Sequence, residues 1–266
     1  HTSSVESVAV SVDGSRVVAG GWDGSVRVWD VDSGETVSVL EGRRAPARSV
    51  AWSLDGSRVV TGGLDGSVHV WDVDSGETVS VLEGHASSVE SVAWSLDGSR
   101  VVAGRWNGSA RVWDVDSGET VSVLEGYAAV ALAVAVSLDG SRVVAEGLDG
   151  SVRVWDVDSG ETVSVLEGHT SRVESVAVSV DGSRVVAGGK DGSVRVWDAK
   201  KRELLRTALH TRSEPGYPAG FASWRPGLPV IDVVEGGAWR DLWIRDENSR
   251  VSRPVIPGVS HEPPAN

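Results

Sequence analysis

Aspartate and glutamate are the most frequent potential metal ligands of this chain, and they recur in a fixed pattern. The first copy of the pattern is Asp30-x-Asp32-x-Gly34-Glu35, with Glu41 a little further on. A helix–loop–helix calcium site would need its glycine one position later and a helix on either side, whereas β-branched residues flank this segment. The aspartates are better explained as residues that cap tight turns. We therefore predict no metal site and no cofactor.

The histidines occupy repeated rather than convergent positions. His1, His85 and His169 stand at equivalent places in separate copies of a repeat, which favours a role in the scaffold. The glycine-rich segment 188–193 lacks the spacing of a phosphate-binding loop and precedes a strand-like segment instead of a helix. No nucleophile, base and orienting acid can be singled out. We predict no catalytic residues and a non-enzymatic protein.

Composition argues against several classes of partner. The net charge is −13, with most of the acidic excess before residue 200, so we expect no nucleic-acid partner. No apolar run approaches the roughly 18 residues of a membrane span, so we expect no membrane partner. The absence of cysteine fits a reducing compartment, and we expect a cytoplasmic protein. Because methionine is also absent and the chain begins in phase with its repeat, we expect it to be part of a longer chain.

The chain is organised around a 42-residue repeat. The stretch VWDVDSGETVSVLEG occupies residues 28–42 and returns unchanged at three later positions, and a divergent fifth copy keeps Val196, Trp197 and Asp198. Such a period is typical of proteins in which one unit must stack on its neighbours to bury its apolar faces.

Within one copy, tight turns separate short segments rich in β-branched residues. Asp13-Gly14 and Asp23-Gly24 favour hairpins, because both residue types tolerate positive φ. The four strands expected in the first copy lie at residues 7–11, 16–20, 25–29 and 35–40. A lone meander would leave one apolar side in water, whereas a ring of like sheets covers both sides. The predicted fold is all-β, a β-propeller of four-stranded antiparallel blades.

The frame from Gly84-His85 to Trp113-Asp114 resembles the WD-repeat (Trp-Asp repeat) β-propeller family. Five Trp-Asp pairs in register carry this resemblance through residues 1–210. The resemblance implies five clear WD-type blades, at residues 1–42, 43–84, 85–126, 127–168 and 169–210.

The rest of the chain is richer in proline and lacks Asp-Gly turns. Segment 221–246 still resembles a decayed blade, with its third strand expected at 242–246, and we place one divergent blade at 211–258. The alternative is a proline-rich tail packed against the fifth blade. We therefore predict a single propeller domain over residues 1–258, followed by a C-terminal tail at 259–266.

The resemblance also implies a hydrogen-bonded brace in each blade. In that family a third-strand tryptophan is linked, through a second-strand Ser or Thr and the histidine of Gly-His, to the turn aspartate. No blade here has all four residue types, and alanine replaces the hydroxyl residue in four blades, so we expect those indole N–H groups to use another acceptor or a water. The candidates for structural blade bracing are Trp29, Trp71, Trp113, Trp155, Trp197, His85, His169, Asp23, Asp65, Asp149 and Asp191.

The copies differ mainly in two windows, one before the inner strand and one at the turn between the second and third strands. Both windows lie at the same end of a meander, so around a ring they form one face. Large side chains at turn tips are typical of contact surfaces, and in the resembled family these are frequent partner-contact positions. We predict that a protein or peptide binds this face. The candidate residues are Trp22, Leu64, Trp106, Leu148, Lys190, Glu6, Arg48, Glu90 and Glu174.

Several alternatives stay open at this point. The tip side chains would fold back over the blade tops if they belonged to the core. Arg43, Arg44 and Arg48 form a local basic spot that either docks an acidic segment or is a solvated loop. The alternative function is a propeller that binds a small ligand or metal, or hydrolyses a substrate, in its central channel. A third possibility is a spacer whose repeats are interchangeable.

Overall fold

The computed structural model describes residues 1–43, 45–106, 108–126, 133–137, 139–179 and 182–210, and three later segments at 222–224, 230–235 and 238–243. Strands are the regular elements of this part of the chain, and none of its residues is helical. The all-β fold class predicted from the repeat is confirmed.

Five sheets contain four antiparallel strands each, and within each sheet the strands follow one another in sequence order. The first two sheets consist of β1 (Val5–Val10), β2 (Arg16–Gly21), β3 (Val26–Asp30) and β4 (Thr36–Leu40), and of β5 (Ala47–Trp52), β6 (Arg58–Gly63), β7 (Val68–Asp72) and β8 (Thr78–Leu82). The next two consist of β9 (Val89–Trp94), β10 (Arg100–Arg105), β11 (Ala110–Asp114) and β12 (Thr120–Leu124), and of β13 (Val134–Val136), β14 (Arg142–Glu146), β15 (Val152–Asp156) and β16 (Thr162–Leu166). The fifth consists of β17 (Val173–Val178), β18 (Arg184–Gly189), β19 (Ser193–Asp198) and β20 (Glu203–His210).

A further sheet has three described strands, β21 (Ala222–Trp224), β22 (Val230–Glu235) and β23 (Ala238–Trp243). The third strand begins earlier than the predicted 242–246. Glu235 pairs with Ala238, so the Gly-Gly pair between them in the sequence was a hairpin signal that the prediction overlooked. Residues 251–258 lie outside the described residues, and the divergent blade at 211–258 and the domain over 1–258 stay predictions.

Serine and aspartate side chains fix the turn that joins the first two strands of a blade. Asp13 accepts hydrogen bonds from the Ser11 hydroxyl at 2.6 Å and from the Ser15 backbone N–H at 3.0 Å. These bonds lower the pKa of Asp13 to about 2. Gly14 follows with φ of 75°, which only glycine adopts without strain. The repeated Ser-x-Asp-Gly-Ser sequence is therefore a turn device rather than a chemical site.

The hydrophobic core lies between neighbouring sheets. Val18, Val26 and Leu40 of the first blade pack in one cluster with Val59 and Trp71 of the second, and all five are fully buried. Each buried valine or leucine contributes about 1.5–3 kcal/mol of transfer free energy, but only while the next blade covers it. Stacking therefore stabilises the repeat, as its periodicity predicted.

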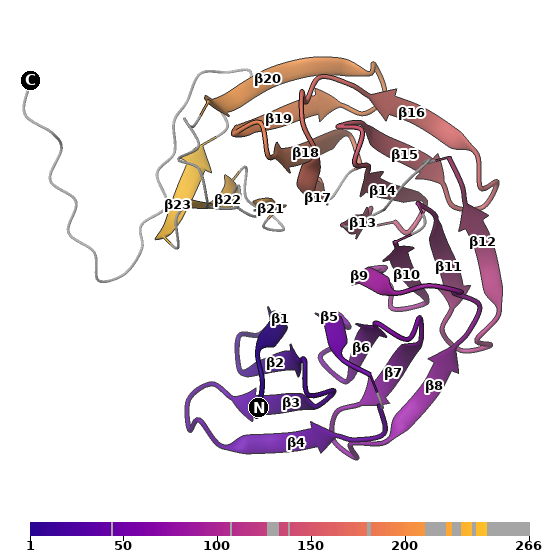
Figure 1. The fold of residues 1–266 in the computed structure, drawn as a ribbon, viewed down its shortest axis with the longest axis vertical. Coiled ribbons are helices and arrows are strands. Elements are labelled where there is room, and N and C mark those ends of the chain that lie inside the picture. The colour runs from indigo at the N-terminus through magenta and orange to yellow at the C-terminus, as the bar shows by residue number, and fades with distance from the viewer. Residues whose placement is uncertain are drawn as a thin grey trace, which may run out of the picture.

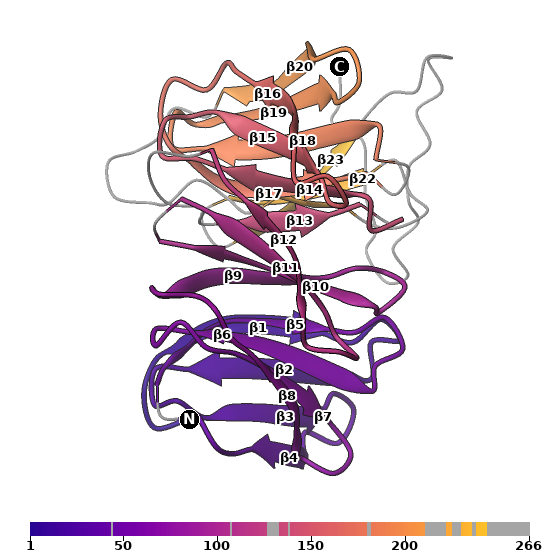
Figure 2. The same ribbon diagram turned by 90° about the vertical axis from the view of Figure 1, so that its right-hand side faces the viewer.

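Figure 1 shows the blades as an arc, with β1, β5, β9, β13 and β17 on the inside and β4, β8, β12, β16 and β20 on the outside. In the view turned by 90°, the sheets of successive blades are stacked along the arc (Figure 2). Val8 and Val10 of β1 are 65 % and 58 % exposed, whereas their equivalents in β5, Val50 and Trp52, are buried. The described part of the chain thus forms an open arc.

Candidate interaction face

In four of the blades, a backbone hydrogen bond joins the two variable windows. The N–H of Trp22, at the turn between β2 and β3, donates to the Ser4 carbonyl at 2.8 Å, just before β1. The equivalent bonds join Trp106 to Ser88, Leu64 to Pro46 and Lys190 to Arg172. The windows therefore form one surface, as the sequence predicted. We call this surface, made of the β2–β3 turns and their equivalents with the connections into the inner strands, the turn-tip face.

The tip side chains do not fold into the core. Trp22 is 46 % exposed, Trp106 is 55 % exposed and Leu148 is 39 % exposed, while Leu64 is half-buried. The side chain of Lys190 is 49 % exposed and lies 3.6 Å from Glu174. The alternative in which the tryptophans cover the blade tops as core residues is therefore wrong for Trp22 and Trp106.

A three-residue ion-pair chain crosses this face. Arg48 lies 2.9 Å from Glu6 of the preceding blade and 2.9 Å from Glu90 of the following one. Burial lowers the pKa of Arg48, but hydrogen bonds to Glu90 and Glu6 and their negative charges outweigh burial and raise it above its usual range. These residues, spaced 42 apart, link three consecutive blades, and their charges are largely satisfied within the chain.

Arg43 does not belong to an exposed basic spot, and the interpretation of Arg43 as a docking residue is corrected. Its side chain is fully buried and donates to the Thr61 hydroxyl at 3.1 Å, to Asp65 at 3.1 Å and to the Ser67 hydroxyl at 3.2 Å. Arg48 is paired as described above, and Arg44 lies outside the described residues.

In the second blade, the same arginine completes the brace. Trp71 donates its indole N–H to Thr61 at 2.9 Å, and Arg43 links Thr61 to Asp65. Arginine therefore takes the place of histidine in the tryptophan–hydroxyl–histidine–aspartate chain. A histidine was expected at this position, but the longer cationic side chain of arginine reaches both neighbours.

In the next three blades, alanine replaces the hydroxyl residue and the tryptophan finds a backbone acceptor. The indole N–H groups donate to carbonyl oxygens thirty residues earlier, at the end of the preceding blade: Trp113 to Glu83 at 3.0 Å, Trp155 to Glu125 at 3.1 Å and Trp197 to Glu167 at 3.3 Å. This is the other acceptor that the sequence left open. In the first blade Trp29 is half-buried, and its ring centroid lies 5.7 Å from that of His1.

The fifth blade contains a charged cluster around Asp191. His169 Nδ1 lies 3.0 Å from Asp191 Oδ1, and Asp191 also accepts from the Ser193 hydroxyl at 2.7 Å and from Arg195 at 2.8 Å. Burial lowers the pKa of His169, while hydrogen bonds from Ser193 and His169 outweigh burial and hold the pKa of Asp191 below its usual range. A neutral histidine therefore faces an ionised aspartate.

The first blade repeats the histidine and serine contacts of this cluster, whereas the described part of the fourth shows the serine contact. His1 Nδ1 lies 3.3 Å from Asp23, and the Ser25 hydroxyl donates to Asp23 at 2.7 Å. In the fourth blade Asp149 accepts from the Ser151 hydroxyl at 2.7 Å, and the residue in the histidine position, Tyr127, lies outside the described residues.

The third blade departs from this pattern. His85 packs edge-on against Trp113, with ring centroids 4.9 Å apart, and among the described residues neither of its buried ring nitrogens has a hydrogen-bond partner. Burial, aided by the positive charges of Arg105 and Arg111, lowers the pKa of His85 to about 3. Among the described residues, the ring contact with Trp113 is the contact that supports the predicted bracing role of His85, and the turn residue Asn107 lies outside the described residues.

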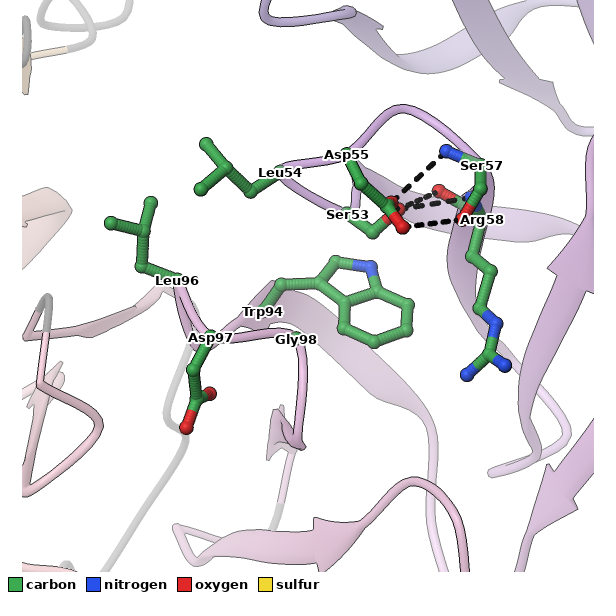
Figure 3. A pocket seen from close by; sticks show the side chains of 9 residues that line it. All are labelled: Ser53, Leu54, Asp55, Ser57, Arg58, Trp94, Leu96, Asp97 and Gly98. Carbon is green, nitrogen blue, oxygen red and sulfur yellow. Dashed lines mark hydrogen bonds between the residues drawn. The ribbon is translucent and has the colours of Figure 1, made fainter.

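A hollow of about 580 Å³ lies on the opposite face, which carries the β1–β2 and β3–β4 turns and their equivalents. Figure 3 shows Trp94 beneath Leu54, with Arg58 at one side and Asp55 bound to Ser53 and Ser57. Asp55 accepts from these two serines at 2.6 and 2.8 Å, which lowers its pKa. The hydrogen bonds of this carboxylate therefore stabilise the turn. No histidine lines this hollow.

The described residues contain no group of three His, Asp or Glu side chains placed to hold a metal ion. None of the described residues belongs to a helix long and apolar enough to cross a membrane.

Comparison with known proteins agrees with this geometry. The WD40 family model (WD domain, G-beta repeat) matches residues 1–30, 34–72, 76–114, 118–156 and 160–198. One stretch of 45 residues is 44 % identical to the "Ribosome biogenesis protein WDR12 homolog" of Brugia malayi. That match spans 17 % of this chain and 10 % of the relative. Because the family matches together cover well over half of the sequence, the chain belongs to the WD40 repeat family.

Proposed function

We propose that this chain is a non-enzymatic interaction scaffold that binds a protein or peptide on its turn-tip face. The observation that carries the proposal is the exposure of Trp22 and Trp106 on one face of an otherwise well-packed β-protein. Tryptophan buries a large area with few rotatable bonds, and it is enriched among residues that dominate binding energy.

The tips are held in place before any partner arrives. The N–H groups of Trp22 and Trp106 donate to Ser4 and Ser88, and Arg48 links three consecutive blades on the same face. A pre-organised surface loses little conformational entropy on binding, which favours affinity. The proposed contact residues are the nine predicted from the sequence, with the two tryptophans as anchors and the paired charges at the rim.

The class of partner follows from charge. With a net charge of −13, the chain repels phosphate backbones and anionic lipid surfaces, so a protein partner is favoured in a cytoplasmic setting. The relative named as a ribosome biogenesis protein is matched over only 10 % of its length, so its assembly role supports scaffolding in general and no particular partner.

The alternative, binding or hydrolysis in the central channel, has weaker support. The Ser7, Ser49 and Ser91 hydroxyls of the inner strands accept the backbone N–H groups of Val50, Val92 and Val134 in the next blade. These hydroxyls therefore serve blade-to-blade attachment. A cluster of convergent acids and histidines at the axis would have favoured chemistry there.

Affinity capture tests the proposal. The chain is immobilised, proteins bound from a cell lysate are identified, and Trp22→Ala/Trp106→Ala is compared with the unchanged chain. The matched control is Val37→Ala/Val121→Ala, which removes exposed apolar side chains from the outer strands of the same two blades. We expect the tryptophan variant alone to lose a reproducible partner at unchanged thermal stability. Equal capture by all three chains would refute binding at the tips.

A further inference from the structure

The third blade differs from the others at the turn that carries its exposed tryptophan. The first blade has Gly-Trp-Asp-Gly at residues 21–24, whereas the third has Arg-Trp-Asn-Gly at 105–108. A glycine has become arginine and the turn aspartate has become asparagine. One cation is thus gained and one anion lost at a single tip of a strongly acidic chain.

In other blades, the turn aspartate contacts the histidine or arginine beside it. Asp23 contacts His1, Asp65 contacts Arg43, and Asp191 contacts both His169 and Arg195. Each of these aspartates therefore supplies a carboxylate to a histidine or an arginine at the base of the tip.

The glycine is needed for this internal contact. A Cβ placed at Gly21 would lie 2.5 Å from His1 Nδ1 and 2.6 Å from Asp23, and one at Gly189 would lie 2.5 Å from His169 Nδ1. All three distances are shorter than real Cβ contacts. Arg105 brings a Cβ to the equivalent place, so the third blade cannot hold its histidine in the same position. Among the described residues, His85 accordingly has no hydrogen-bond partner of the kind that His1 and His169 have in Asp23 and Asp191.

What remains in the third blade is a group of basic side chains. Arg111 lies against Gly84, because a Cβ there would meet Arg111 Nη1 at 2.6 Å, and it donates to Thr120 at 3.1 Å. Arg105 donates through Nε to the Ser109 hydroxyl. Burial and the charge of Arg111 lower the pKa of Arg105, and Glu125 is the acid that offsets this effect. His85 adds two buried ring nitrogens without a partner among the described residues.

We propose that Arg105 and Arg111, with His85 beside them, form a binding site for the carboxylate of an aspartate or glutamate in a protein partner. The inference rests on the proposed function, because Trp106, 55 % exposed between Arg105 and Asn107, provides the apolar contact next to the charge. The partner segment is therefore acidic with a neighbouring apolar residue. A carboxylate is favoured over a phosphate, because the equivalent place in other blades accommodates a carboxylate.

The experiment is an NMR titration of the ¹⁵N-labelled chain at low ionic strength with three end-capped pentapeptides. Their sequences are Ala-Leu-Glu-Leu-Ala, the same peptide with glutamine in place of glutamate, and the same peptide with phosphoserine. We expect the glutamate peptide to bind at least tenfold more tightly than the glutamine peptide and to shift resonances of the third blade. Equal binding of these two peptides overturns the proposal, and binding of the phosphoserine peptide alone overturns the choice of a carboxylate.

Two variants keep the test independent of folding. Arg105→Gly/Asn107→Asp converts the tip to the sequence of the first blade, and Arg105→Gln removes the charge at similar size. Both should abolish the tenfold preference for glutamate while the chain melts cooperatively. Retention of the preference in both variants contradicts the site.

Failure of this site is distinguishable from failure of the proposed function. Trp22→Ala lies two blades away and changes no charge, so it tests the face without touching Arg105. If partner capture depends on Trp22 but the charge variants change nothing, the turn-tip face binds a partner and the acidic-residue assignment alone is wrong.

Discussion

The indole nitrogen of Trp155 lies 3.1 Å from the carbonyl oxygen of Glu125, thirty residues earlier in the chain. Trp113 and Trp197 make the same contact with Glu83 and Glu167. Because each carbonyl follows the outer strand of the preceding blade, the bond joins two blades rather than bracing one. The repeat tolerates alanine at its second-strand position because this acceptor recurs with the period of the fold.

Thr61→Val should destabilise the chain more than its size suggests. Thr61 accepts from both Trp71 and the fully buried Arg43, so an isosteric valine leaves two buried donors with one acceptor fewer. We expect a loss of about 2 kcal/mol in the free energy of unfolding, measured by urea denaturation. Thr78→Val, an exposed threonine of the same blade, is the control and should change it by less than about 0.5 kcal/mol.

Gly189→Ala should destabilise the fifth blade through His169. The added Cβ would lie 2.5 Å from His169 Nδ1 and 3.0 Å from Asp191 Oδ1, so one of these groups must move and their hydrogen bond must lengthen. We expect a cost of about 1–3 kcal/mol. A double-mutant cycle with His169→Ala is the measurement: additive effects in the two variants would show that no clash with the histidine occurs.

Stability should fall as the pH drops below about 6.5. Burial lowers the pKa of His69 to about 4 and that of His85 to about 3, whereas an unfolded histidine takes up its proton near pH 6.5. Between pH 6.5 and 4 the unfolded state therefore binds more protons, and the free energy of unfolding decreases by up to about 1.4 kcal/mol per histidine and pH unit.

Urea denaturation at pH 7 and pH 5 measures this loss. In His69→Gln the free energy of unfolding should differ less between pH 7 and pH 5, because only one of the two histidines still titrates. If the free energy of unfolding changes equally with pH in the unchanged chain and in the variant, the pH dependence comes from other groups. One such group is His169, whose pKa is also lowered by burial.

The sequence predicted the repeat, the four-stranded sheets and the meeting of the two variable windows, because hydrophobic alternation and Asp-Gly turns are local properties. It did not predict the partners of Trp155 or Arg43, because one is a backbone carbonyl of another blade and the other depends on the reach of an arginine side chain. The pairing of Arg48 with Glu6 and Glu90 likewise follows from how blades stack. The sequence of one repeat does not show which residues of the next blade it contacts, so these contacts become visible only when the blades are positioned beside one another.

Restoring the pattern of the first blade in the third should rebuild the missing brace. In Arg105→Gly/Asn107→Asp the glycine removes the Cβ that excludes the histidine, and the aspartate offers His85 the carboxylate that His1 and His169 have. We expect about 1 kcal/mol of added stability and a higher pKa for His85, followed by imidazole NMR shifts. Asn107→Asp alone should give much less of either effect, because Arg105 still occupies the histidine's place. If the single variant matched the double one, charge rather than close packing would decide whether a blade is braced.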